Sequence, residues 1–171
     1  MKKVFLTTVI VSIAICSLHA QANKSVFLEV GGNGLGFSAN FDSRFTKSEK
    51  GFGFRAGVGF MPPTHSETDI IYPSTPFMLT VPLAINHLAG KAPNYFESGI
   101  GITYVYTSGN VSSEFWGYSE DATGSSLAFV PSVGYRHAKT GKAFQWRTVI
   151  SPVFGPGGAM FWMGLSLGYK F

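Results

Sequence analysis

Segment 64–69 combines side-chain types that are used in hydrolytic and acyl-transfer chemistry. It reads Thr-His-Ser-Glu-Thr-Asp. In acyl transfer a histidine activates a hydroxyl group and a carboxylate orients the histidine, so His65, Ser66 and Asp69 are candidate catalytic residues. The same loop could instead hold a divalent cation through His65, Glu67 and Asp69. Neighbours within one loop rarely form a triad, and all of these are ordinary residues of a solvated loop. The sequence therefore predicts no catalysis, no metal site and no cofactor.

A second candidate site is aromatic. Segment 107–125 places Phe115, Trp116 and Tyr118 among serines, glycines and acidic residues. Exposed aromatic side chains on a loop favour contact with a glycan, a protein or another surface. Local packing of the loop onto the rest of the molecule is the alternative. We interpret the three residues as a surface-contact loop.

The composition limits the kinds of fold that could position these loops. Of 171 residues, 45% are hydrophobic and only 13% are charged, against roughly 25% in ordinary soluble domains. This composition argues against disorder, and a single cysteine argues against a disulfide scaffold. The formal net charge of +4 comes without a lysine-rich block, which argues against nucleic acid as a partner. The length allows one domain, and the mean hydropathy of +0.18 implies a large apolar surface.

The N-terminal segment has the pattern of a secretory signal peptide. Lys2 and Lys3 precede a mostly apolar run over 4–18, and an Ala-Gln-Ala sequence ends at Ala22. The run is shorter than the ~20 residues that a membrane-spanning helix needs, and the bulky residue before Cys16 disfavours a lipoprotein signal. We predict a signal peptide over 1–22 and a barrel domain over 23–171. Removing 1–22 lowers the net charge from +4 to +2.

The remaining chain alternates between apolar and small or polar residues. In 52–60, for example, Phe52, Phe54, Ala56, Val58 and Phe60 share one strand face, opposite glycines and an arginine. The same period of two predicts eight strands, at 26–31, 35–44, 52–60, 77–86, 96–106, 126–136, 144–154 and 161–171.

The connections between these strands alternate in length. Short polar breaks at 46–51, 89–94 and 138–142 alternate with long ones at 61–75 and 107–125. Short turns at one end and long loops at the other are typical of outer-membrane barrels. Parity then requires an outer turn at Gly32-Asn33-Gly34, where Asn-Gly is a strong hairpin signal. One long bent strand over 25–45 with a glycine bulge is the alternative.

The outward aromatic residues support this arrangement, because they fall into two belts as expected at two membrane interfaces. The inner belt comprises Phe45, Phe52, Phe96, Tyr135, Phe144, Trp146, Tyr169 and Phe171. The outer belt comprises Phe37, Phe60, Phe77, Tyr104, Tyr106, Phe129, Phe154 and Phe161. No run of 18 apolar residues follows the signal segment, so a closed barrel is the remaining membrane-spanning design. The fold class that we predict is all-β: an eight-stranded antiparallel up-and-down transmembrane β-barrel.

The C-terminus adds a resemblance to a known family. Segment 164–171 ends on outward Tyr169 and terminal Phe171, and resembles the signal by which outer-membrane barrels are recognised for assembly, with Ser166 where glycine is usual. Residues 23–171 resemble small eight-stranded barrels of the OmpA/OmpX type, and 27–34 with 40–45 resemble uncharacterised outer-membrane proteins of the Bacteroidetes. The resemblance implies a Gram-negative outer-membrane location, with barrel-assembly machinery, outer-membrane lipids and lipopolysaccharide as partners. It implies no catalytic residue.

The inward faces carry charged residues that must pair inside a narrow barrel, because an isolated buried charge is costly. We predict a lumen polar network of Glu29, Asp42, Arg44, Arg55, Glu97, Arg136, Arg147 and Lys170. An eight-stranded barrel is just wide enough to be filled by side chains, so a salt-bridged plug is favoured over a narrow pore. Inward Phe27, Met78 and Trp162 favour filling as well.

Three prolines fall within the predicted strands. Proline donates no ladder hydrogen bond, so Pro82, Pro131 and Pro152 should interrupt pairing or end strands. The strands of Pro131 and Pro152 are neighbours, and their shared wall could be weakly paired near the outer rim. Gaps of this kind admit acyl chains in lipid-modifying barrels such as the palmitoyl transferase PagP. The prediction is a structural or surface-interaction protein without catalysis. A lipid-modifying acyl transferase or deacylase, a narrow channel and a secreted barrel with an interior ligand are the alternatives.

Overall fold

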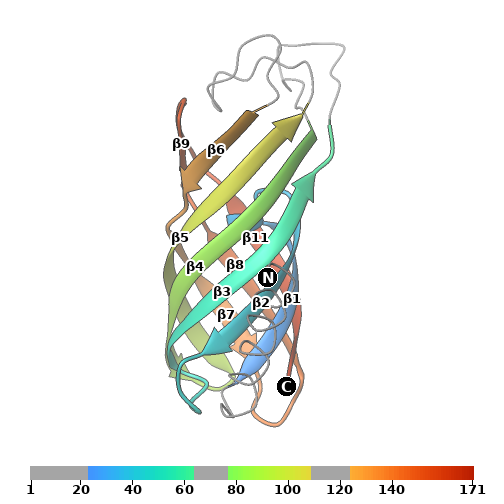
Figure 1. Ribbon diagram of the computed structural model, residues 1–171. Coiled ribbons are helices and arrows are strands. Elements are labelled where there is room, and N and C mark those ends of the chain that lie inside the picture. Colours follow the sequence, from blue (N-terminus) through green and yellow to red (C-terminus); the bar gives the residue numbers. More distant parts are fainter. Residues whose placement is uncertain (1–22, 64–76, 109–123) are drawn as a thin grey trace, which may run out of the picture.

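The computed structural model describes residues 23–63, 77–108 and 124–171. Within these ranges the chain forms one antiparallel sheet that closes on itself as a barrel (Figure 1). The predicted signal peptide over 1–22 and most of the two long loops lie outside the described residues. In the part that is described, no helix is long and apolar enough to cross a membrane.

Eleven strand segments make up the wall in the described part of the chain. They are β1 (Lys24–Gly31), β2 (Phe37–Arg44), β3 (Gly51–Met61), β4 (Phe77–Lys91), β5 (Asn94–Ser108), β6 (Gly124–Phe129), β7 (Ser132–Ala138), β8 (Phe144–Ile150), β9 (Val153–Gly155), β10 (Gly158–Met160) and β11 (Met163–Lys170). Three pairs of segments, β6–β7, β8–β9 and β10–β11, are each separated by only two residues. The described chain is therefore an eight-stranded barrel, as the sequence predicts.

The barrel closes through the pairing of β1 with β11 and of β5 with β7. β1 pairs antiparallel with both β2 and β11, and β5 pairs with β6 near one end and with β7 near the other. The backbone amide of Phe171 donates to the carbonyl oxygen of Lys24 at 2.9 Å, which ties the C-terminus to the first strand. The separate β1 and β2 exclude the alternative of one long bent strand.

The two faces of the wall differ as the alternation predicts. Outward side chains such as Leu28, Val58 and Ile100 are more than half exposed, whereas inward polar side chains are buried. Most aromatic residues of both predicted belts are exposed on the outside, although Tyr135, Trp146 and Phe77 are half-buried. From Phe96 to Tyr106, a strand tilted as in a barrel rises about 25 Å, which matches the apolar band of a membrane barrel.

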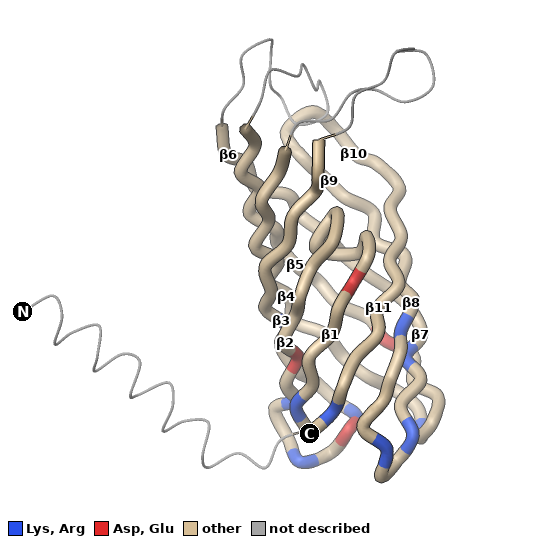
Figure 2. Tube along the Cα trace, turned by 90° about the vertical axis from the view of Figure 1, so that its right-hand side faces the viewer, with Lys and Arg blue, Asp and Glu red and all other residues tan. Residues whose placement is uncertain are grey.

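The connection between β1 and β2 differs from the predicted hairpin turn. Gly32–Gly34 forms a single 3₁₀ turn that is buried, and Asn33 is 1% exposed. Positive φ values occur at Gly31, Gly32 and Leu35 rather than at the Asn-Gly pair, so the type I′ geometry is absent. The turn lies inside the barrel because Thr103 and Thr80 donate hydrogen bonds to the carbonyl oxygens of Asn33 and Gly34, at 2.7 and 2.8 Å. Figure 2 shows this connection ending at mid-height, below the outer rim.

The prolines affect the wall as predicted. Pro131 separates β6 from β7 and Pro152 separates β8 from β9, so neither of these predicted strands is continuous. Beyond the two breaks, β6 and β9 pair only through Phe129 and Phe154. Pro82 remains inside β4, but pairing with β3 is interrupted there, between Leu83 and Thr80. A third break, at 161–162, contains no proline.

Candidate functional site in the lumen

The lumen is the part of the described structure where polar chemistry is concentrated. Alternation along β1, β2, β3, β5, β7 and β8 aims seven charged side chains at one level of the interior. Glu29, Asp42 and Glu97 supply carboxylates, and the guanidinium groups come from Arg44, Arg55, Arg136 and Arg147. All seven residues are at most 3% exposed.

Asp42 is the acceptor for one side of this network. Its carboxylate accepts hydrogen bonds from Arg44 at 2.8 Å, Arg55 at 2.9 Å and Arg136 at 3.1 Å. Asn86 is the fourth residue that donates to the same carboxylate, at 2.8 Å, and it accepts a bond from Arg44. Both carboxylate oxygens are therefore fully used by neighbours from β2, β3, β4 and β7.

Glu97 joins the two sides of the network. It accepts bonds from Arg55 at 3.1 Å, from Arg136 at 2.8 Å and from Arg147 at 2.7 Å. Because Arg55 and Arg136 bind both carboxylates, Asp42 and Glu97 are held by the same pair of guanidinium groups. Planar guanidinium groups suit such shared pairing better than lysine would, since each offers five donors.

Glu29 closes the other side. It accepts from Arg147, from Ser166 at 3.1 Å and from Asn40 at 3.2 Å, with Ser38 at 3.4 Å. Its partners come from β2, β8 and β11, so these bonds cross the seam where β1 and β11 meet. Each of the three buried carboxylates thus has charged and neutral donors around it, which is the condition under which burying charge is tolerated.

An aromatic ring lies under the guanidinium groups. The ring centroid of Phe27 is 5.3, 5.0 and 5.8 Å from the Cζ atoms of Arg55, Arg136 and Arg147. The face of an aromatic ring attracts cations, most strongly when water is excluded. Gly168 makes room for the ring, because a Cβ at this position would clash with it. Inward Phe27 therefore stabilises the network as well as filling space.

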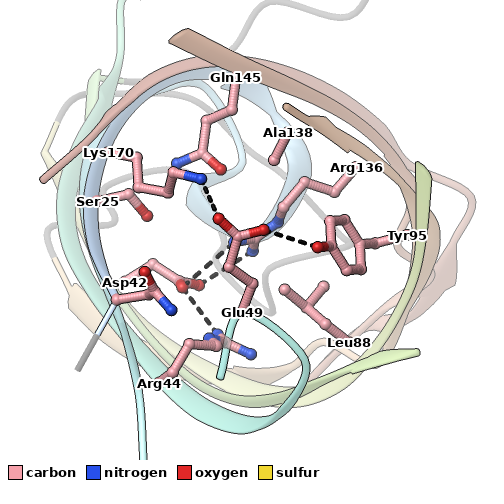
Figure 3. Close-up of a pocket in the computed structure, with 11 residues that line it drawn as sticks. Ser25, Asp42, Arg44, Glu49, Leu88, Tyr95, Arg136, Ala138, Gln145 and Lys170 are labelled. Atoms are coloured by element: carbon pink, nitrogen blue, oxygen red, sulfur yellow. Dashed lines mark hydrogen bonds and ion pairs between the residues drawn. The ribbon is translucent and has the colours of Figure 1, made fainter. Parts of the chain in front are cut away.

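A second, smaller cluster closes the end of the barrel where the short turns lie. Glu49, in the turn between β2 and β3, binds the ammonium group of Lys170 and accepts a hydrogen bond from Tyr95 at 2.7 Å (Figure 3). Partial burial acts to raise the pKa of Glu49, but these two hydrogen bonds and the charge of Lys170 outweigh it. The net pKa of Glu49 lies below its ordinary value. Between this cluster and the network remains a cavity of about 20 Å³, enough for roughly one water.

An apolar cluster lies in the opposite half of the lumen, beside buried polar side chains such as Thr103 and Thr107. The cluster comprises Leu35, Met78, Val105, Ala128, Val130 and Val153. Met61, Met160 and Trp162 pack against it. Inward Met78 and Trp162 thus fill the interior here, and Leu35 reaches the cluster because the β1–β2 turn folds inward. Side chains therefore also fill the lumen beyond the charge network, toward the end with the long loops.

The structure brings most, but not all, of the predicted lumen residues together. Seven of the eight predicted lumen charges meet in one network, whereas Lys170 lies apart from it and binds Glu49. Glu49, Asn86 and Tyr95 are site residues that sequence reasoning misses. Alternation along the predicted strand 77–86 puts Asn86 on the inward face, but a turn residue such as Glu49 carries no alternation signal. Outward Tyr169 and Phe171 are 59% and 63% exposed, next to the closing seam.

His65, Ser66 and Asp69 lie outside the described residues, as do Phe115, Trp116 and Tyr118. Across 23–63, 77–108 and 124–171, no group of three His, Cys, Asp or Glu residues is placed to hold a metal ion.

Comparison with known proteins identifies the fold. No protein-family model matches the chain, and no curated protein matches it. Among solved structures, the N-terminal β-barrel domain of Pseudomonas aeruginosa OprF is 11% identical, with a TM-score of 0.57 over 88% of this chain and 96% of that one. Yersinia pestis Ail, an outer membrane protein, is 13% identical, with a TM-score of 0.52 over 88% of this chain and 98% of that one. The chain has the closed, eight-stranded antiparallel barrel fold of these two proteins.

Proposed function

We propose that this chain is an integral outer-membrane protein whose barrel is a non-conducting, non-catalytic anchor for surface-exposed loops. The observation that carries the proposal is the contrast between the two faces of the wall. The outside is a continuous apolar surface, while the inside pairs every one of three buried carboxylates with arginine. A water-soluble barrel would bury its apolar face and expose its charges.

The filled lumen supports the non-conducting part of the proposal. An ion would have to pass the Glu49–Lys170 pair, the arginine network and then the apolar cluster around Leu35. The described residues leave a cavity of about 20 Å³ on this path, at the short-turn end.

Three measurements test the proposal together. When cells are fractionated, the protein should be recovered with the outer membrane. Purified protein kept folded in cold detergent should change its gel mobility on boiling. In a planar bilayer it should give no unitary conductance steps. Discrete conductance steps that become larger when a bulky residue of the charge network, such as Arg136, is replaced by alanine would establish a channel instead. Recovery as a soluble periplasmic protein would overturn the membrane placement.

The surface role rests on the long loops. We propose that Phe115, Trp116 and Tyr118 contact a glycan, lipopolysaccharide sugars or a protein at the cell surface. Replacing all three with alanine should preserve the heat-dependent mobility shift and reduce adhesion of expressing cells to a glycan array or to host-cell protein. Unchanged adhesion in the triple variant would contradict this role.

Lipid modification is the second candidate function, and one observation favours it. β6 and β9 share a single residue pair, and β10 pairs only with β9 among the described strands, so the wall is weakly joined beside the apolar cluster around Leu35. If the chain modifies lipid A, the lipid A mass spectrum should differ between cells with and without the gene. The difference should disappear with Ser66→Ala or His65→Ala. Identical spectra would leave the anchoring role as the function.

A further inference from the structure

The two kinds of cationic side chain occupy different parts of the barrel. All four arginines lie in the lumen network, whereas all seven lysines after residue 22 lie near the end with the short turns. In Figure 2 the blue segments all fall in the lower half of the barrel. The long segments 64–76 and 109–123 contain acidic residues but no lysine or arginine. Among the described residues, the positive charge is therefore concentrated in the half of the barrel that ends in the short turns (Figure 2).

Five of these lysines form an exposed ring, which we call the lysine ring. It consists of Lys47, Lys50, Lys91, Lys139 and Lys142: Lys91 ends β4, and the other four lie in the connections that follow β2 and β7. Four side-chain carboxylates occur in the described part of the chain. Three of them are buried in the network, and Glu49 is bound to Lys170 and Tyr95. The described structure thus gives the lysine ring no acidic partner within the chain.

The position of the ring relative to the inner aromatic belt indicates what it meets. Lys91 follows Ala89, which pairs with the exposed belt residue Phe96. Two residues of a tilted strand rise about 5 Å, so Lys91 lies just beyond the belt. Aromatic belts lie at headgroup level, and lysine stems reach from there toward the phosphate groups. Lys139 and Lys142 follow the same pattern beside Phe144, which is 60% exposed.

We propose that the lysine ring binds the phosphate groups of anionic phospholipids in the inner leaflet of the membrane around the barrel. This rests on the membrane placement proposed above. A polybasic cluster at a membrane surface attracts anionic lipids, and an ammonium group acts there as a hydrated point charge. In the dry interior, arginine is suited to share its donors between two carboxylates. At the hydrated rim, lysine is suited to attract lipid phosphate groups as a point charge.

The test compares lipid retention between charge-removing and charge-conserving variants of the full chain. One variant changes all five ring residues to glutamine, and its matched control changes the same five to arginine. Each protein is placed in nanodiscs of zwitterionic phosphatidylcholine containing a minority of anionic phosphatidylglycerol. The lipids that remain bound are counted by native mass spectrometry at low and high salt.

We expect the wild-type protein and the arginine variant to retain phosphatidylglycerol preferentially at low salt. The preference should fall roughly tenfold in the glutamine variant, and high salt should weaken it in the charged proteins. Equal retention by the glutamine variant would overturn the proposal. So would loss of retention in the arginine variant, because the charge is conserved there.

Two parallel readouts separate the possible causes of failure. The heat-dependent mobility shift of every variant reports whether the barrel is folded, and its absence in the wild-type protein would refute the membrane placement itself. Pull-down on isolated peptidoglycan tests a different acidic partner. If the glutamine variant loses peptidoglycan binding while its phosphatidylglycerol preference is unchanged, the lipid proposal is wrong and the ring faces the cell wall.

Discussion

At the scale of single residues, the lumen depends on a few side chains that each satisfy several others. Arg136 binds both Asp42 and Glu97 and lies over the ring of Phe27. Removing one partner of a buried ion pair leaves an uncompensated charge in a medium that solvates it poorly. Such a residue contributes more to stability than an exposed charge of the same type.

Arg136→Met should therefore lower the free energy of unfolding by about 3–5 kcal/mol. The measurement is urea-induced unfolding from detergent micelles, followed by tryptophan fluorescence. Lys142→Met is the matched control, because Lys142 is exposed on a turn and its loss should change stability by no more than about 0.5 kcal/mol. A similar small loss in both variants would show that the network contributes little to the stability of the fold.

Glu49 gives a prediction about pH. Because its pKa is lowered in the folded state, its contribution to stability is complete above the ordinary pKa of 4.5 and is lost as pH falls through the lowered value. Glu49→Gln should be less stable than the wild-type protein at neutral pH, and this difference should shrink below pH 4.5. Unfolding curves across the acid range test this, and a difference that is independent of pH would contradict it.

At the scale of elements, pairing is strong on one side of the barrel and weak on another. β4 and β5 pair along fifteen residues each, while β6 and β9 share one pair. The prolines explain part of the contrast, since Pro131 and Pro152 cannot donate ladder hydrogen bonds. The outer half of this wall depends on side-chain packing, such as the tilted contact of Phe129 with Phe154 at 6.1 Å.

Amide hydrogen exchange should reveal this difference directly. Segments with few backbone partners open locally at lower free energy, so β6, β9 and β10 should exchange faster than the paired residues of β4 and β5. Mass-spectrometric exchange in detergent micelles resolves these segments. Equal protection along the whole wall would show that packing alone makes up for the missing ladder bonds.

At the scale of the whole molecule, the fold is a barrel turned inside out relative to a soluble protein. Its interior contains arginines and carboxylates, and its exterior carries the large apolar side chains. Leu28 is 71% exposed in the middle of β1, between Ala39 and Leu167 on neighbouring strands. An exposed leucine side chain is poorly solvated by water, whereas lipid hydrocarbon solvates it well.

Leu28→Arg should therefore cost about 2–4 kcal/mol when the protein unfolds from phospholipid vesicles, because a charge at the midplane of a bilayer is poorly solvated. Thr140→Arg, on an exposed turn, is the control and should be nearly neutral. If Leu28→Arg is also neutral or stabilising, the apolar face does not meet lipid.

Much of this architecture was predictable because a strand encodes its two faces locally. The period of two identified the strands and assigned Asp42 and Arg55 to the inside and Leu28 to the outside. The two belts and the position of Tyr169 followed from the same pattern. Pro131 and Pro152 predicted two of the three interruptions of the strands, whereas the interruption at 161–162 has no comparable sequence signal.

The sequence by itself determined that the chain is all-β, with an apolar outside and a charged inside, because each face depends only on neighbouring residues. Only the tertiary structure decided which charges meet. Arg147 and Glu29 are 118 positions apart, and Lys170 and Glu49 are 121 apart. Those contacts depend on the register of strands around a closed barrel, and the inward turn at Gly32–Gly34 depends on acceptors that Thr80 and Thr103 satisfy from across the lumen. Neither the ion pairs nor the inward turn can therefore be predicted from a short segment of the sequence.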